Sequence, residues 1–209
     1  GRGGREMNGS QKPKAIDKEV RWDKTQTIMS KTDLFGTIEY INDVFTDVSG
    51  YEDAEIVNKP HNTIRHPDMP KAIFKLLWVN IKAGNQFHGI IKNLAKSGRY
   101  YWAITNFEYT KDAKGNITNY IAKRKAVPQE IITNHIEPLY KKILSVEQAS
   151  GEVAAEKYLV GYLEDIGLTY VDYITKLMMD HEKLSVVETE SAEVQNKKKS
   201  GFFSSFFGN

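Results

Sequence analysis

The sequence predicts an α+β fold, in which a five-stranded antiparallel sheet carries helices across one face and is followed by further helices. Two segments with strand-like composition, residues 27–32 and 36–42, come first, and three more follow at residues 87–96, 99–110 and 117–126. Ser-Gly and Lys-Gly-Asn separate the last three, and both are hairpin signals. Hairpins join antiparallel strands, so this order of segments indicates one antiparallel sheet.

Helical segments fill the interval between the two groups of strands. Residues 43–49 and a short piece around Ala54 come before a proline-rich loop. Residues 69–83 then show the apolar spacing of an amphipathic helix, which Gly84 ends. Because helices packed across one face of a sheet leave space between the two layers, we expect a pocket there.

The C-terminal part is also predicted to be helical. Residues 128–144 and 151–166 carry apolar stripes, and a kink is expected near Pro138. A capping-box pattern starts a third helix over residues 169–183. The polar composition of residues 188–199 favours a flexible linker.

These observations divide the chain into five parts. Residues 1–14 are expected to be a disordered leader, 15–26 an N-terminal flanking helix, 27–127 the sheet domain that holds the pocket, 128–185 helices for signal transfer or docking, and 186–209 a flexible linker with a basic and aromatic tail.

Composition excludes several classes of function. The 209 residues include 29 basic and 27 acidic ones, for a net charge of +2, so no global field favours nucleic acid. The absence of cysteine excludes disulfides, thiolate-bound iron–sulfur clusters and a covalent cysteinyl–flavin adduct. No apolar run approaches the roughly 18–20 residues that span a bilayer, so the cytoplasm is the expected compartment. No nucleophile–base pair, metal cluster or phosphate-binding glycine pattern stands out, and we expect no enzymatic activity.

The loop at residues 60–70 is the most informative segment. It holds three prolines, two histidines, an asparagine, an arginine and an aspartate within eleven residues. Proline fixes φ and removes a backbone donor, so the loop is held in one shape. Such a loop suits the orientation of a polar, phosphate-bearing ligand at a pocket mouth. The alternative interpretation is a proline-rich connector with solvated charges.

Short motifs follow one another in order through the central segment: Asn42-Asp43-Val44-Phe45, Val48-Ser49-Gly50-Tyr51, Lys59-Pro60-His61-Asn62, Ile64-Arg65-His66-Pro67-Asp68-Met69-Pro70, Phe74, Trp78, Ile91-Lys92-Asn93 and Tyr101-Trp102, with a continuation in Glu137-Pro138-Leu139-Tyr140. Together they resemble the PAS domain of bacterial aerotaxis and energy-taxis receptors, over roughly residues 27–144. The resemblance implies a PAS fold, noncovalent FAD and a redox signal that is passed to the chemotaxis machinery. It carries the cofactor-binding role onto Asn42, Arg65, His66, Asp68, Trp78, Asn93 and Trp102.

Each polar residue of this set has a plausible task. Arg65 can fork onto a phosphate or pair with Asp68, and the second alternative would be a structural ion pair. Asn93 offers a donor and an acceptor to the pyrimidine edge of a flavin, and a buried amide without a partner is costly. His66 can donate a hydrogen bond, with a protonation that follows the charge of the flavin.

Three residues have simpler alternatives. Trp78 and Trp102 offer flat apolar walls to an isoalloxazine ring, but Trp78 on a helix can equally be a core residue. Asn42 can cap the helix that follows it instead of contacting a ligand.

Receptors of this kind carry a transmembrane segment and a long signalling tail in the same chain, and this chain has neither. The expectation is therefore a separate cytoplasmic sensor that signals to a membrane-bound transducer of the methyl-accepting type, with a homodimer left open. The tail has the composition of a membrane-surface anchor at the inner face of the membrane. The residues concerned are Lys197, Lys198, Lys199, Phe202, Phe203, Phe206 and Phe207. A disordered basic tail, or a peptide that docks onto a partner, is the alternative.

Two other functions compete with the flavin sensor. A b-type haem sensor would need an axial histidine, which in haem PAS domains usually lies on the helix before the third strand. That helix, residues 69–83 here, contains no histidine. A ligand-free PAS domain that dimerises or docks a partner is the second alternative.

Overall fold

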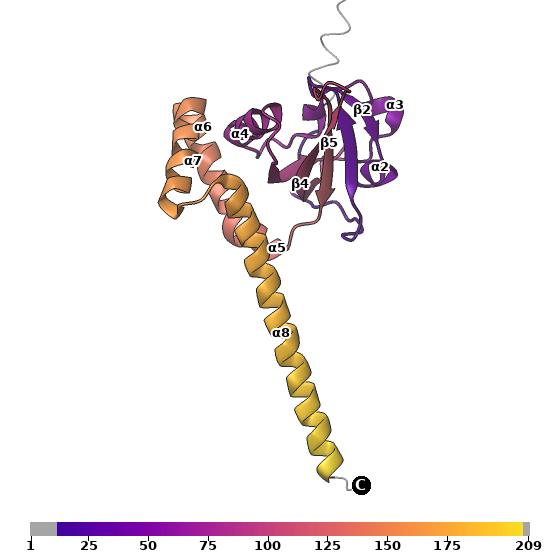
Figure 1. The fold of residues 1–209 in the computed structure, drawn as a ribbon, viewed down its shortest axis with the longest axis vertical. Helices are drawn as coiled ribbons and strands as arrows, with labels where there is room; N and C mark the ends of the chain where they lie inside the picture. Colours follow the sequence, from indigo (N-terminus) through magenta and orange to yellow (C-terminus); the bar gives the residue numbers. More distant parts are fainter. Residues whose placement is uncertain (1–11, 207–209) are drawn as a thin grey trace, which may run out of the picture.

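The computed structural model describes residues 12–206, and it describes side chains up to Lys197. Figure 1 shows a sheet domain, a group of C-terminal helices and one long helix that extends beyond both. The elements of the sheet domain are β1 (Ile28–Thr32), β2 (Ile38–Ile41), α2 (Asp43–Ser49), α3 (Asp53–Ile56), the 3-10 helix η1 (His61–Ile64), α4 (Lys71–Lys82), β3 (His88–Leu94), β4 (Tyr100–Lys111) and β5 (Ile117–Lys125). The C-terminal elements are α5 (Gln129–Ile131), the π-helical turn η2 (Ile132–Ile136), α6 (Glu137–Ser150), α7 (Glu152–Ile166) and α8 (Tyr170–Phe206).

The predicted five-stranded antiparallel sheet is confirmed. The strand order is β2-β1-β5-β4-β3, and every neighbouring pair is antiparallel. In the β3–β4 pair Asn93 lies opposite Tyr101, and Lys92 lies opposite Trp102. Successive side chains of a strand point to opposite faces, so these two pairs lie on opposite faces of the sheet.

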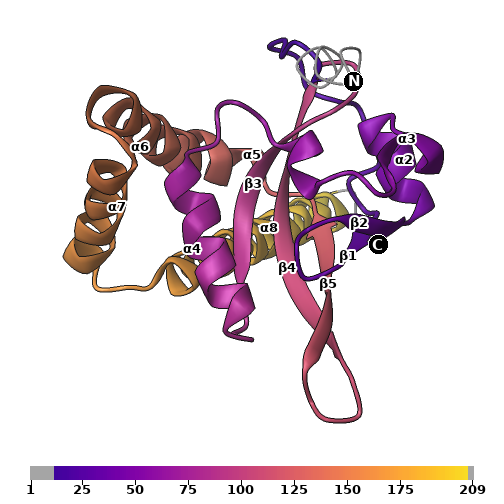
Figure 2. The same cartoon turned by 90° about the horizontal axis from the view of Figure 1, so that it is seen from above.

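Helices cover both faces of the sheet. Figure 2 shows α2, α3 and α4 beside the sheet. Together with η1 they pack on the face that holds Asn93. The C-terminal helices lie along the β3 side, where α6 faces Lys92 and Trp102 and α8 faces Ile104. The fold is therefore α+β, as predicted, with a cavity between the sheet and α4.

The predicted N-terminal flanking helix over residues 15–26 is wrong. This segment is extended and lies beside the start of β4, where Val20 N donates to Tyr100 O (2.8 Å) and Tyr100 N donates to Lys18 O (3.0 Å). Its two apolar anchors, Val20 and Trp22, are two residues apart and both pack on the core, as on one face of a strand. The start of β4 supplies the backbone partners that a helix would have found within itself.

The predicted end of the last helix is also wrong. Instead of a helix that ends near Lys183 and a flexible linker over residues 188–199, one helix, α8, continues to Phe206 (Figure 1). Residues 188–199 include three glutamates and three lysines, which are good helix formers, and Glu193 and Lys197 have the favourable i, i+4 spacing. The side chains of residues 188–197 are all exposed, so this part of the helix is surrounded by solvent.

The irregularity expected near Pro138 is the π-helical turn η2, which ends at Ile136. Pro138 follows in the first turn of α6. Proline has no backbone N–H, so the regular hydrogen-bond ladder cannot continue through this position. The polypeptide adopts the wider turn there and then resumes an α-helix.

Candidate functional site

A cavity of about 260 Å³ lies between the sheet and the helices η1 and α4. Its walls are mostly apolar, with aromatic side chains from α4, β4 and β5: Phe74, Trp78, Phe107 and Tyr120. The polar residues that line it are His61, Asn62, Arg65, Asn93, Thr105 and Arg124, together with Thr32 at the end of β1. A mostly apolar cavity with a few polar groups is the usual form of a small-molecule site.

Arg65 follows η1 and lines the cavity. Its guanidinium carbon lies 3.8 Å from the centre of the Phe74 ring, and its buried Nε has no hydrogen-bond partner among the described residues. Burial lowers its pKa. The predicted pair with Asp68 does not form, because Asp68 binds Lys92 Nζ at 2.7 Å. The guanidinium is therefore available to a ligand.

Asn93 lies in β3 on the cavity face and is 2% exposed. Its side-chain Nδ2 donates to Ile91 O (3.2 Å) and Tyr101 O (3.3 Å), which fixes the orientation of the amide. Its Oδ1 accepts no hydrogen bond from any residue in the described part of the chain. The residue is thus an oriented acceptor at the cavity wall.

Trp78 also lines the cavity, as predicted, and meets the edge of Tyr120 with 5.9 Å between ring centres. It packs against the core as well, so both interpretations of this residue describe its position.

The sequence interpretation missed Arg124, in β5. It is 1% exposed and lines the cavity. Its Nη2 donates to Ser30 Oγ at 3.0 Å and to His61 Nε2 at 2.5 Å, whereas its buried Nη1 has no partner within residues 12–197. Burial lowers its pKa to about 10. The available signal was alternation, since Tyr120, Ala122 and Arg124 share the buried face of β5.

His61 stays neutral beside this arginine. Burial, followed by the charges of Arg124 and Arg65, lowers its pKa to about 3. The ring can then accept the Arg124 hydrogen bond. Together Arg65 and Arg124 place two positive charges at a cavity whose lining includes no Asp or Glu within the described residues. Such a cavity favours an anionic or electron-rich ligand.

Acidification from pH 7 to pH 5 should destabilise the fold through His61. A histidine whose pKa is lowered by folding gives its full stability above about pH 6.5 and loses it as the pH falls toward 3, because the unfolded chain takes up the proton first. We expect His61 to account for about 2 kcal/mol of the loss at pH 5, measured by urea unfolding as the difference in pH dependence between the wild-type protein and His61→Gln. His61→Gln should reduce this loss, whereas His135→Gln, at an exposed position, should leave it unchanged.

Asn42 does not line the cavity, and its predicted contact with the cofactor is not supported. It is the N-cap of α2, where its Oδ1 accepts from Phe45 N and from Met29 N, both at 3.0 Å. Its Nδ2 donates to Thr27 O at 2.9 Å. All of its side-chain hydrogen bonds in the described structure thus join β1 to α2.

Replacing Asn42 with alanine should lower the free energy of unfolding by about 2 kcal/mol, since a cap and two further backbone hydrogen bonds are lost. Ligand binding by the folded fraction should be unchanged. Urea unfolding gives the first quantity and titration with flavin the second. A variant of normal stability that binds no flavin would return Asn42 to the ligand site.

His66, Asp68 and Trp102 line a second cavity, of about 450 Å³, on the opposite face of the sheet. Trp102 lies opposite Lys92 in the register and faces α6, so it is on the other face of the sheet from Asn93 and Trp78. His66 Nδ1 accepts from Asp68 N at 3.0 Å. Burial, then the Lys92 charge, lowers the pKa of His66 to about 4, so it is neutral. The predicted site residues are therefore divided between two cavities.

Two other kinds of site are not found in residues 12–206. No group of three or more His, Asp or Glu side chains there has the arrangement of a metal site. No helix in that range is long and apolar enough to cross a membrane.

Comparison with known proteins fits this geometry. Residues 38–122 match the family model described as PAS fold. The aerotaxis receptor of Escherichia coli K12 is 43% identical over 118 residues, which is 56% of this chain and 23% of the receptor. The bacterioopsin transcriptional activator of Halobacterium salinarum is 26% identical over 111 residues, 50% of this chain and 16% of that protein. The chain thus spans less than a quarter of the length of either relative.

Among solved structures, the dark state of the blue-light photoreceptor Aureochrome1 LOV is similar to this chain. It is 20% identical, with a TM-score of 0.48 over 59% of this chain and 96% of that one. On the family match, the sheet domain of this chain is a PAS domain. More particularly, its sequence is similar to that of the aerotaxis receptor over 118 residues.

Proposed function

We propose that this chain is a redox sensor in energy taxis, and that it binds FAD noncovalently in the cavity between the sheet and α4. The observation that carries the proposal is a set of buried polar atoms without partners among the described residues, in a mostly apolar cavity. They are Arg65 Nε, Thr105 Oγ1 and Arg124 Nη1. Buried polar atoms are normally paired, so their presence here supports a bound ligand that supplies acceptors. The similarity to the aerotaxis receptor supports the same class of function.

The residues present fit a flavin. A volume of about 260 Å³ lies just below the roughly 300–1,000 Å³ usual for ligand pockets, so it suits one ring system rather than a dinucleotide. The rest of an FAD molecule would extend outside. Aromatic walls match the flat faces of the ring, and the two arginines match its acceptors and phosphates.

Each residue has a defined part in this proposal. When bound, the flavin supplies reversible acceptance of electrons. Arg65 binds phosphate or ring acceptors through its guanidinium. Arg124 stabilises negative charge that develops in the cavity, and neutral His61 holds the Arg124 side chain in place. Asn93 offers its oriented amide to the ring edge and, as a residue of β3, connects the cavity to the sheet.

The signal would pass from the sheet to the C-terminal helices and from there to a membrane-bound transducer of the methyl-accepting type. The sensor would then work at the cytoplasmic face of the membrane. The proposed membrane contact of the tail runs from Lys197 to Phe207, and of its side chains the structure describes that of Lys197. Deletion of residues 197–209 should weaken binding to anionic liposomes, and unchanged binding would dismiss that contact.

The test is a visible absorption spectrum of the purified protein before and after dithionite. A flavin double band in the blue region that bleaches on reduction supports the proposal, and heat release with chromatography then identifies FAD. A sharp Soret band would replace it with a haem sensor. No chromophore, even after reconstitution with FAD, would leave a ligand-free domain that docks a partner.

A further inference from the structure

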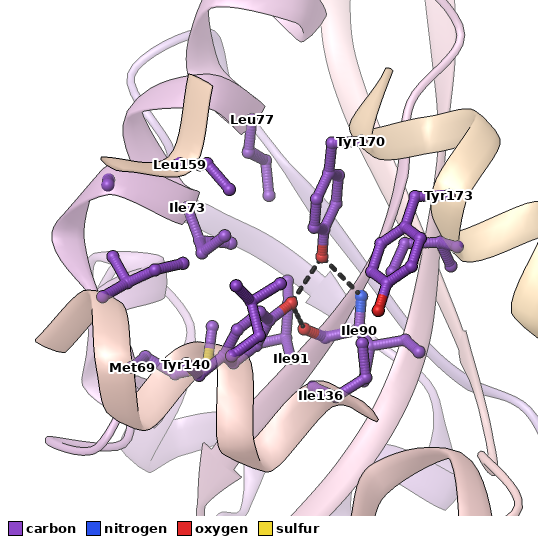
Figure 3. Close-up of a cluster of buried hydrophobic side chains, with 14 of the residues drawn as sticks. Met69, Ile73, Leu77, Ile90, Ile91, Ile136, Tyr140, Leu159, Tyr170 and Tyr173 are labelled. Carbon is purple, nitrogen blue, oxygen red and sulfur yellow. Dashed lines mark hydrogen bonds between the residues drawn. The ribbon is translucent and has the colours of Figure 1, made fainter. Parts of the chain in front are cut away.

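Two tyrosines from separate helices meet at the outer edge of β3. Tyr140 of α6 and Tyr170 of α8 both bring their hydroxyls to the backbone of Ile90 (Figure 3). Ile90 N donates to the Tyr170 hydroxyl at 3.2 Å, and the Tyr140 hydroxyl donates to Ile90 O at 2.7 Å. The two hydroxyl oxygens are 2.5 Å apart.

The protons of these groups can be assigned by counting. Each hydroxyl carries one proton, and that of Tyr140 is used by Ile90 O. The contact between the hydroxyls must therefore be a donation from Tyr170 to Tyr140. The result is a closed ring that runs from Ile90 N–H through Tyr170 and Tyr140 to Ile90 O. Burial raises the pKa of Tyr170 to about 12 and that of Tyr140 well above its usual value, so both stay protonated.

This hydroxyl ring takes the place of a neighbouring strand. β3 is an edge strand, and Ile90 is fully buried. Backbone groups at a buried edge need hydrogen-bond partners, and leaving the Ile90 N–H and C=O without them would be costly. Here the partners come from helices 50 and 80 residues further along the chain.

The same strand lines the ligand cavity. Ile91 and Asn93 face the cavity from β3, on either side of Lys92. At the other end of the strand, His88 Nε2 contacts Thr175 Oγ1 of α8 at 2.7 Å and Val171 O at 3.1 Å. A shift of β3 caused by the ligand would therefore reach the start of α8 directly.

We propose that the hydroxyl ring is the junction through which the ligand state of the cavity reaches α8. A change at Asn93 that displaces β3 opens the ring and loosens the first turns of α8. This inference rests on the proposed flavin site and adds its output connection.

The experiment compares Tyr170→Phe with Tyr173→Phe by hydrogen exchange, with and without FAD. Tyr173 is the matched control, since it lies on the same helix and its hydroxyl contacts that of Tyr162 at 3.3 Å instead of the strand. Tyr170→Phe should raise exchange at the Ile90 amide about tenfold and abolish the FAD-dependent change in residues 170–178. Tyr173→Phe should preserve both.

A second variant keeps both hydroxyls. A Cβ at Gly89 would lie 3.2 Å from the Tyr170 hydroxyl oxygen. Gly89→Ala should therefore displace the Tyr170 side chain and reproduce the effect of Tyr170→Phe. Absence of flavin from the wild-type protein would refute the proposed function. Flavin bound normally, with Tyr170→Phe and Tyr173→Phe indistinguishable, would refute this inference alone.

Discussion

Arg65→Ala should yield a folded protein that is purified without flavin. The guanidinium lines the cavity from the loop side with a buried Nε that has no partner in the described structure, and it lies over Phe74. Charge-assisted hydrogen bonds are worth about 1.5–3 kcal/mol, so its loss should weaken flavin binding roughly ten- to hundredfold. The measurement is the ratio of flavin to protein absorbance after gel filtration, followed by titration of the variant with FAD.

Arg21→Ala is the matched control for this experiment. Arg21 is exposed in the N-terminal segment, away from the cavity lining, and its removal should leave the flavin content unchanged. Asn93→Ala should reproduce the loss seen with Arg65→Ala, because it removes the oriented amide. Stoichiometric flavin in both Arg65→Ala and Asn93→Ala would show that the ligand lies elsewhere.

Gly98→Ala should destabilise the protein by about 3 kcal/mol, a large cost for the addition of one methyl group. Gly98 has a φ of +89°, and a Cβ there would lie 2.2 Å from the carbonyl oxygen of Lys14. The substitution therefore strains the β3–β4 turn and pushes the extended N-terminal segment away. That segment depends on this contact, since Ile16 N donates to Gly98 O at 2.9 Å.

Gly115→Ala separates the backbone strain at a positive φ from the clash with the Lys14 carbonyl oxygen. Gly115 has a similar φ of +84°, but no described atom lies within 4 Å of the position that a Cβ would take there, so only the backbone strain of about 1 kcal/mol applies. In urea unfolding, the free energy of unfolding of Gly98→Ala should therefore be well below that of Gly115→Ala. Faster tryptic cleavage at Lys18 in Gly98→Ala would report detachment of the segment. Equal stability of the two variants would contradict the role of the Lys14 contact.

The sheet and its short helices could be predicted because their signals are local. Alternating apolar residues, hairpin glycines and a helical stripe lie within each segment. The N-terminal segment could not be predicted in this way, because its hydrogen-bond partners, Gly98 and Tyr100, lie some 80 residues away. A charged, short segment without those partners has the composition of a helix.

The site was predicted in part for a related physical reason. The sequence indicates that Asn93 and Trp102 belong to paired strands, but not the register that places them on opposite faces. Arg124 lies between Lys123 and Lys125, and a run of three cations resembles a solvated face. Its alternation with Tyr120 and Ala122 is the one local signal, and the pairing of β5 with β1 and β4 then places this face of the strand inside.

The length of α8 turns small rotations into large displacements. The helix has 37 residues, and of its side chains up to Lys197 only those in the first two turns are buried against the rest of the protein. At about 1.5 Å per residue it is about 55 Å long, so a tilt of about 5° at its base moves its far end by roughly 5 Å. A small rearrangement near Ile90 need not change the fold. At the other end of α8 it would still produce a displacement the size of an amino-acid side chain.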